Sequence, residues 1–108
     1  MARAFYQVEE FDNSLESELK VFEHEPHNAE SAFKIGNIFS DKGNYTEASK
    51  YFKKMLDIDP TNTTAYYEQA FALTNIHLNH EAIKNLFKVI DLDPKYQKAY
   101  FILGYNYN

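Results

Sequence analysis

The sequence predicts an all-α protein in which helical hairpins repeat and stack into one solenoid. Two observations support this prediction. The three prolines of the 108-residue chain, Pro26, Pro60 and Pro94, are spaced 34 residues apart. Between them, apolar residues recur at the i, i+3, i+4, i+7 spacing that is typical of amphipathic helices. A fixed period of this kind, filled with helical patterns, indicates an array of helical repeats.

Small residues repeat with the same period. Gly36, Ala70 and Gly104 form one series, and Ala48 and Ala82 form another. Such residues carry little or no side chain, so two helices can approach each other closely there. Large apolar or aromatic residues repeat beside these contacts, at Phe5, Phe39, Leu73 and Tyr107. One hairpin cannot bury its own apolar face, so neighbouring repeats are expected to stack.

Local signals predict where the helices begin and end. Gly43 and Asn44 form a turn between two periodic segments. The residue before Pro60 is pushed out of the α region, so a helix should end there. Asn28 and Asn62 can cap the helices that follow them. The expected helices lie near residues 2–8, 11–24, 29–41, 45–58, 63–76, 79–92 and 96–107.

Composition excludes several classes of function. The net charge is −5 and no Lys/Arg cluster stands out, which disfavours nucleic-acid binding. The chain has no Cys, so disulfides, Cys-based zinc sites and Cys nucleophiles are excluded. No apolar run approaches the roughly 18 residues of a membrane span. The first ten residues lack the apolar run of a secretory signal. We expect a cytoplasmic protein without membrane association or a cofactor.

Histidines and paired carboxylates have structural explanations. His77, His80 and Glu81 are spaced like metal ligands, but His77 takes the turn position of Gly43, and His tolerates left-handed backbone. We therefore favour a turn over a metal site. Two carboxylate pairs precede a proline in register, which marks them as helix-end residues rather than catalytic pairs; these are Asp57 with Asp59 and Asp91 with Asp93. No phosphate loop, nucleophile elbow or metalloprotease motif is present, so no enzyme activity is expected.

The 34-residue pattern resembles the tetratricopeptide repeat. The fullest copy runs over residues 29–62 and carries Ile35-Gly36, Phe39, Gly43-Asn44-Tyr45, Ala48, Phe52 and Leu56-Asp57-Ile58-Asp59-Pro60. The resemblance implies a right-handed solenoid of antiparallel helical hairpins. It divides the single array 1–108 into a partial repeat 1–28, repeats 29–62 and 63–96, and a partial repeat or end helix 97–108.

The chain departs from the family pattern in places. The family usually has Trp where Ala32, Tyr66 and Tyr100 stand. In the second copy, Gln69 occupies the position of Ile35, and the pair after the first helix is His-Leu rather than Gly-Asn.

In this family the first helix of each repeat lines a concave groove. The resemblance therefore implies a peptide-binding face, and five aromatic residues in this chain fall on it. Nothing in the repeat register requires them for packing within a hairpin, and aromatic side chains suit recognition surfaces. The expected site residues are Phe33, Asn37, Tyr67, Glu68, Phe71, Lys98, Phe101, Ile102 and Tyr105. The alternative is that another hairpin or helix covers these aromatics.

One known subtype fails a residue-by-residue test. Family members that bind chaperone tails hold a C-terminal carboxylate with two Lys, two Asn and one Arg. Asn37 and Lys98 stand at two of these positions. The other three positions hold Phe33, Glu68 and Ile102. Glu68 would repel a carboxylate, so the sequence argues against binding of such tails.

The leading prediction is a protein–protein interaction scaffold that binds a peptide or protein segment in this groove. Its partner is not identified by the sequence. The alternatives are a self-associating structural module and a regulatory fragment of a larger protein. Both ends of the sequence align with half-repeats, so either a longer array continues them or a second chain covers them. We expect homo-oligomers to form through Phe5 and Tyr6 at one end and Leu103 and Tyr107 at the other.

Overall fold

The computed structural model describes residues 14–107. A helical segment covers residues 14–24, and five further helices follow: α2 (Ala29–Asp41), α3 (Tyr45–Ile58), α4 (Thr63–Asn75), α5 (Asn79–Leu92) and α6 (Gln97–Tyr107). The described residues contain no strand. The all-α prediction is confirmed, and α2 to α6 begin and end within one residue of the predicted bounds. The helix expected at 2–8 lies outside the described residues.

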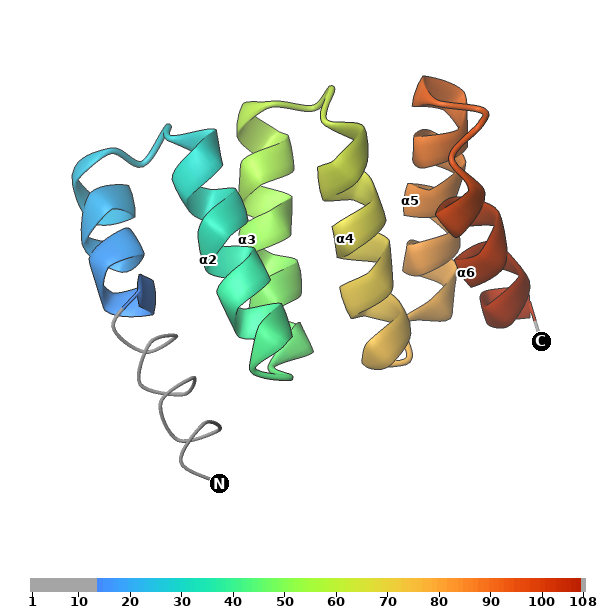
Figure 1. Ribbon diagram of the computed structural model, residues 1–108, viewed down its shortest axis with the longest axis horizontal. Coiled ribbons are helices and arrows are strands. Elements are labelled where there is room, and N and C mark those ends of the chain that lie inside the picture. Colours follow the sequence, from blue (N-terminus) through green and yellow to red (C-terminus); the bar gives the residue numbers. More distant parts are fainter. Residues whose placement is uncertain (1–13, 108) are drawn as a thin grey trace.

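The helices form antiparallel hairpins that stand side by side (Figure 1). Helix α2 pairs with α3, and α4 pairs with α5, while α3 packs against α4 and α5 against α6. The first helices of successive hairpins also contact each other, α2 with α4 and α4 with α6, whereas α3 and α5, both fully described, have no Cα atoms within 8 Å of each other. The array is therefore tighter along α2, α4 and α6, which makes this row of helices its concave side.

Asparagine side chains begin three of the helices, as the sequence predicted for two of them. The Oδ1 atom of Asn28 accepts a hydrogen bond from Ser31 N–H at 3.0 Å, and that of Asn62 from Ala65 N–H at 2.9 Å. At the start of α3, Asn44 Oδ1 accepts a hydrogen bond from Glu47 N–H at 3.4 Å. Each bond satisfies one of the free N–H groups in the first turn of a helix. Helix α5 follows Leu78, whose side chain cannot make this bond.

The turns inside the two hairpins share one backbone conformation. Gly43 has φ of +82°, and His77, 34 residues later, has φ of +64°. Histidine is among the residues that enter the left-handed region more readily than most. The interpretation of His77 as a turn residue is confirmed.

The series of small residues has two different roles in the structure. A Cβ atom on Gly36 would lie 2.6 Å from Cε1 of Phe52, so only glycine allows the buried Phe52 ring to approach α2 this closely. Ala70 is buried in one cluster with Leu86. Gly104 is exposed, and a Cβ there would have no described heavy atom within 4 Å. Close helix approach thus occurs at Gly36, while Gly104 of α6 is open.

A hydrogen bond repeats with the period of the sequence. The hydroxyl of Tyr66 donates to the carbonyl of Pro60 at 2.9 Å, and that of Tyr100 donates to the carbonyl of Pro94, also at 2.9 Å. Each bond ties the first turn of a first helix to the preceding inter-repeat turn. Two of the positions where tetratricopeptide repeats usually carry Trp therefore hold tyrosines that fix the geometry between repeats.

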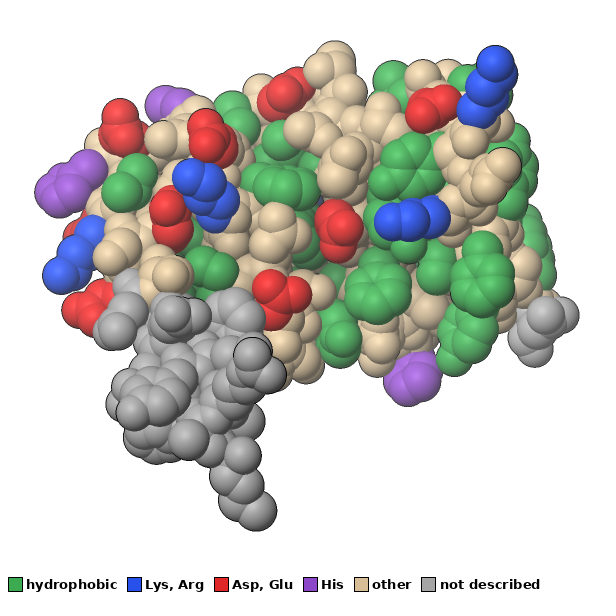
Figure 2. Space-filling model, in the orientation of Figure 1, with side chains coloured by type: hydrophobic (Ala, Val, Ile, Leu, Met, Phe, Trp, Pro, Cys, Tyr) green, Lys and Arg blue, Asp and Glu red, His purple; other side chains and the backbone are tan. Residues whose placement is uncertain are grey.

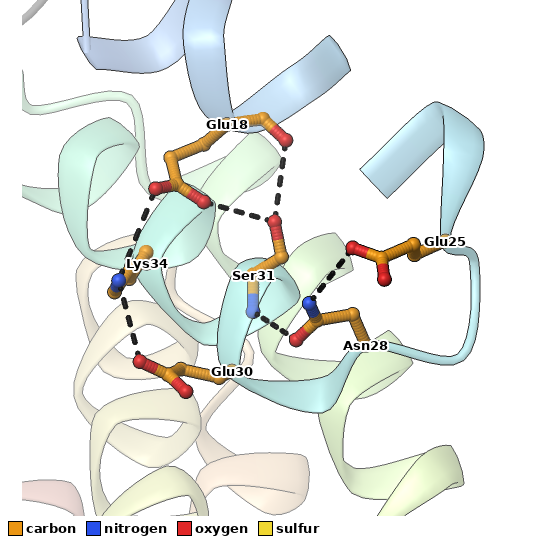
Figure 3. Close-up of polar contacts among 6 residues, drawn as sticks. All are labelled: Glu18, Glu25, Asn28, Glu30, Ser31 and Lys34. Carbon is orange, nitrogen blue, oxygen red and sulfur yellow. Dashed lines mark hydrogen bonds and ion pairs between the residues drawn. The ribbon is translucent and has the colours of Figure 1, made fainter. Parts of the chain in front are cut away.

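A polar cluster joins residues 14–24 to α2 (Figure 3). The buried Ser31 hydroxyl lies 2.9 Å from the Glu18 carboxylate, and the ammonium group of Lys34 lies 3.9 Å from the same side chain. Lys34 also lies 3.3 Å from Glu30, one turn before it on α2. These contacts hold the 14–24 helix against the start of the first complete hairpin.

Candidate functional site on the concave face

The concave face carries exposed apolar surface beside charged side chains. Figure 2 shows this face, with α2, α4 and α6 toward the viewer, and hydrophobic side chains gather over α4 and α6. Two residues of α6 are the most exposed large hydrophobics in the described chain: Phe101 is 78% exposed and Tyr105 66%. Aromatic side chains left this accessible are typical of binding surfaces rather than of a core.

A cleft of about 250 Å³ lies between α4 and α6 at this place. Its walls are formed by Phe71, Thr74, Asn75, His77, Phe101, Ile102 and Tyr105. Of the nine predicted site residues, Phe71, Phe101, Ile102 and Tyr105 are brought together here. A largely apolar cleft with a few polar groups at its edge fits one bulky side chain of a partner. We refer to it below as the aromatic cleft.

Packing beneath the cleft holds its walls in place. The Phe71 ring meets the Tyr45 ring edge-on, with centroids 5.9 Å apart. On the other side, the buried Asn106 side chain donates to the Thr74 hydroxyl and to the carbonyl of Ile102, both at 2.9 Å. The Thr74 hydroxyl in turn donates to the Ala70 carbonyl at 2.8 Å. This chain of bonds fixes α6 to α4, so the cleft is preformed.

Sequence reasoning about the groove did not include Thr74 or His77. The sequence assigned His77 to the turn after α4. The structure shows that His77 also lines one end of the cleft. The available signal was the distance along the chain: His77 follows Phe71 by six residues, which places it in the turn just after α4. Thr74 is polar and buried, and the prediction of the groove relied mainly on aromatic residues.

Two predicted site residues have a share in packing. Phe33 is half-buried, with its ring centroid 5.7 Å from that of Phe52 on the paired helix. The half-buried Tyr67 lies 5.3 Å from Tyr96 and packs on the core between α4, α5 and α6. The expectation that packing within a hairpin does not require the five aromatics was wrong for Phe33, which packs against its paired helix. Whether an aromatic side chain packs between helices depends on the direction in which it leaves its helix, and the repeat period alone does not specify that direction.

Phe33 and Asn37 belong to α2 and do not line the aromatic cleft. Asn37 is half-buried on the concave row. The two residues lie one repeat before Tyr67 and Phe71 in the register, so they extend the concave face toward residues 14–24.

Glu68 brings negative charge to the centre of the concave face. It lies three residues before Phe71 on α4, and its side chain is half-buried. Burial raises the pKa of Glu68 above its usual value; Lys98 of α6 opposes this rise, and the charge of Asp41 at the end of α2 adds to it. Burial likewise raises the pKa of Tyr67, and Glu68 adds to that rise. A carboxylate that is costly to ionise here would gain from a cationic partner.

The described residues contain no group of three or more His, Cys, Asp or Glu side chains placed to hold a metal ion. In the same part of the chain, no helix is long and apolar enough to cross a membrane.

Comparison with known proteins identifies the repeat. Residues 29–62 match the tetratricopeptide repeat family. This is the copy that the sequence predicted as the fullest, and it contains α2 and α3. The chain therefore contains a tetratricopeptide repeat over these residues. The family assignment agrees with the hairpin stacking and with the 34-residue period of the proline and tyrosine positions.

Solved tetratricopeptide structures superpose on nearly the whole chain. The crystal structure of MamA is 31% identical, with a TM-score of 0.89 over 94% of this chain. The second tetratricopeptide domain of human RPAP3, solved in complex with an HSP70 peptide, is 18% identical, with a TM-score of 0.87 over 98% of this chain and 88% of that domain. The chain spans 60% of the MamA chain. The solenoid prediction is confirmed, while the repeat boundaries at 1–28, 63–96 and 97–108 stay predictions.

Proposed function

We propose that this tetratricopeptide array is a protein–protein interaction scaffold that holds a segment of a partner protein on its concave face. The single observation that carries the proposal is the aromatic cleft between α4 and α6. Phe101 and Tyr105 are its most exposed lining residues. The third aromatic residue of the cleft, Phe71, packs against the Tyr45 ring. Such rings supply a large contact area at a low entropic cost.

The comparisons support a peptide-binding role for this fold. The RPAP3 domain that superposes on this chain was solved with a bound peptide, and so was the first such domain of the RPAP3 protein Spaghetti, at a TM-score of 0.86. Their identities of 16% and 18% support the fold and not a shared ligand. The positions occupied by Phe33, Glu68 and Ile102 here argue for a different ligand from a carboxylate tail.

A selection experiment tests the proposal. Random peptides displayed on phage are selected on the immobilised chain, and the strongest binders are measured by fluorescence polarisation. Phe71→Ala and Tyr105→Ala should each weaken binding by about tenfold or more, since removing a central aromatic anchor costs about 2 kcal/mol. Lys53→Ala, an exposed position on α3, is the matched control. Peptides that bind both cleft variants as tightly as the native chain would overturn the proposal.

A second candidate function, self-association, is favoured by the exposed face of α6 that carries Tyr100, Gly104 and Tyr107. Tyr100 and Tyr107 are exposed there, and Gly104 between them is open. Leu103→Glu should weaken association, because a charge would be buried without a partner. Sedimentation velocity over a hundredfold concentration range measures this, and a monomer throughout would exclude it. Phe5 and Tyr6, the other predicted contacts, lie outside the described residues.

A further inference from the structure

Helix α6 stands at one end of the array and has a second exposed face (Figure 1). Tyr100, Gly104 and Tyr107 recur at the spacing of one helix face, and Tyr107 is 64% exposed. A Cβ atom on Gly104 would have no described heavy atom within 4 Å. Phe101 and Tyr105, which line the aromatic cleft, lie on the opposite side of α6. We call the face with Tyr100, Gly104 and Tyr107 the α6 end face.

Helix α2 carries the same pair of a glycine and an aromatic residue, and there α3 covers it. Gly36 and Phe39 stand two periods of 34 residues before their counterparts on α6. A Cβ atom on Gly36 would lie 2.6 Å from the Phe52 ring, and the Phe39 ring stacks with Tyr51, with centroids 5.8 Å apart. Two consecutive aromatic residues of α3 therefore fill the notch at the glycine and the space beside it.

Helix α4 shows a different pairing at the same positions. It carries Ala70 and Leu73, and its neighbour α5 carries Asn85 and Leu86 where α3 has its two aromatics. Leu86 is buried in one cluster with Ala70 and Leu73. The Cβ atom of an alanine occupies space that the ring takes over a glycine, so the smaller leucine fits there. Since α6 has the residue pair of α2 and not that of α4, its end face matches a neighbour that resembles α3.

The adjoining positions of α5 are also more apolar than their counterparts inside the array. A cleft of about 570 Å³ between α3 and α5 is lined by charged and polar side chains, among them Lys53 and Gln69. One period later, these two positions hold Phe87 and Leu103, and Phe87 is 48% exposed. A helix that packs on the α6 end face would therefore meet apolar side chains where the internal cleft is polar.

We propose that the α6 end face binds an amphipathic helix of a partner protein, and that this helix presents two consecutive aromatic residues in the arrangement of Tyr51 and Phe52. The first ring stacks on Tyr107, and the second enters the notch at Gly104. A folded second copy of the chain does not offer its own α3, because Phe52 is fully buried. The inference goes beyond the proposed function, which uses the aromatic cleft on the other side of α6.

Two synthetic helices test this shape requirement. The probe is a fluorescein-labelled peptide with the sequence of residues 45–58, held helical by a lactam bridge between Lys53 and Asp57, which are both exposed on α3. The matched control peptide carries Tyr51→Asn and Phe52→Leu, the pair found on α5. Fluorescence polarisation with the native chain should give a Kd for the aromatic probe that is at least about tenfold lower, because the control lacks both aromatic anchors.

Variants of the chain locate the binding site. Gly104→Ala adds a Cβ atom where the second ring should sit, so the Kd of the aromatic probe should rise by about tenfold and that of the control peptide should change less. Tyr107→Ala should weaken the aromatic probe as well, because it removes the stacking partner. Thr46→Ala, at an exposed position of α3, should leave both affinities unchanged. Circular dichroism verifies that each variant folds.

The outcomes decide whether the notch selects its ligand. If both peptides bind equally, or if the preference for the aromatic probe survives in Gly104→Ala, the inference fails. If neither peptide binds, the inference is also overturned, and a dimer that Leu103→Glu dissociates in sedimentation velocity would identify a second copy as the occupant. Peptides selected for the aromatic cleft should not displace the aromatic probe, so this inference and the proposed function fail separately.

Discussion

At the scale of single residues, two glycines of one series have opposite structural roles. Gly36 faces the Phe52 ring, and a Cβ atom there would lie 2.6 Å from it. Phe52 is fully buried and packed against Phe33, so its ring has little room to move. Gly104 faces open space. The sequence shows the same small residue in both places, and only the packing tells them apart.

This difference predicts opposite effects of one substitution. Gly36→Ala should lower the free energy of unfolding by about 1–2 kcal/mol, because overpacking outweighs the gain in helix propensity. Gly104→Ala should raise it by about 0.5–1 kcal/mol, because propensity acts there without a clash. Urea denaturation measures both. Equal effects of the two substitutions would mean that α2 and α3 do not approach as closely as described.

Glu68 predicts a pH dependence at the residue scale. Its folded-state pKa is raised above the usual 4.5, chiefly by burial, so the folded state binds its proton more tightly than the unfolded state does. Stability is therefore lost as pH rises through the window between 4.5 and the folded pKa. Glu68→Gln removes this loss. The difference in melting temperature, variant minus native, should grow as pH rises from about 4 to 7. A constant difference would show that Glu68 titrates alike in both states.

At the scale of helices, local chemistry specifies the elements well. Proline positions, the asparagine caps and apolar spacing predicted α2 to α6 because these signals act within a few residues. The cleft was predictable in part for the same reason. Phe71, Phe101 and Tyr105 follow from the helix face and the period. The packing roles of Phe33 and Tyr67 did not follow, since they depend on side-chain directions between helices.

The start of α5 offers a test of helix capping. Asn44 and Leu78 occupy the same register position with similar backbone angles, φ of −91° and −92°, but only Asn44 accepts a hydrogen bond from the first turn. Leu78→Asn should stabilise the fold by about 0.5–1 kcal/mol, and Asn62→Ala should destabilise it by about 1 kcal/mol. Thermal unfolding followed by circular dichroism compares the two. A destabilised Leu78→Asn variant would indicate that the leucine contributes packing instead.

At the scale of the whole molecule, the curvature of the array decides which helices line its concave side. The row formed by α2, α4 and α6 is the tighter side of the array, and it carries the aromatic cleft. The 34-residue period predicted the solenoid and its concave row. It did not predict the cleft itself, because that requires Asn106 and Thr74 to fix α6 against α4.

The most direct test of the central claim, that the concave face binds a partner segment, is an NMR titration of the ¹⁵N-labelled chain with the strongest selected peptide. The proposed function predicts that chemical-shift changes concentrate on α4 and α6, around Glu68, Phe71 and Phe101. Residues on the outer side, such as Lys53 of α3 and Asp91 of α5, should change little. Shift changes confined to α3 and α5 would place the binding surface on the opposite face and contradict the claim.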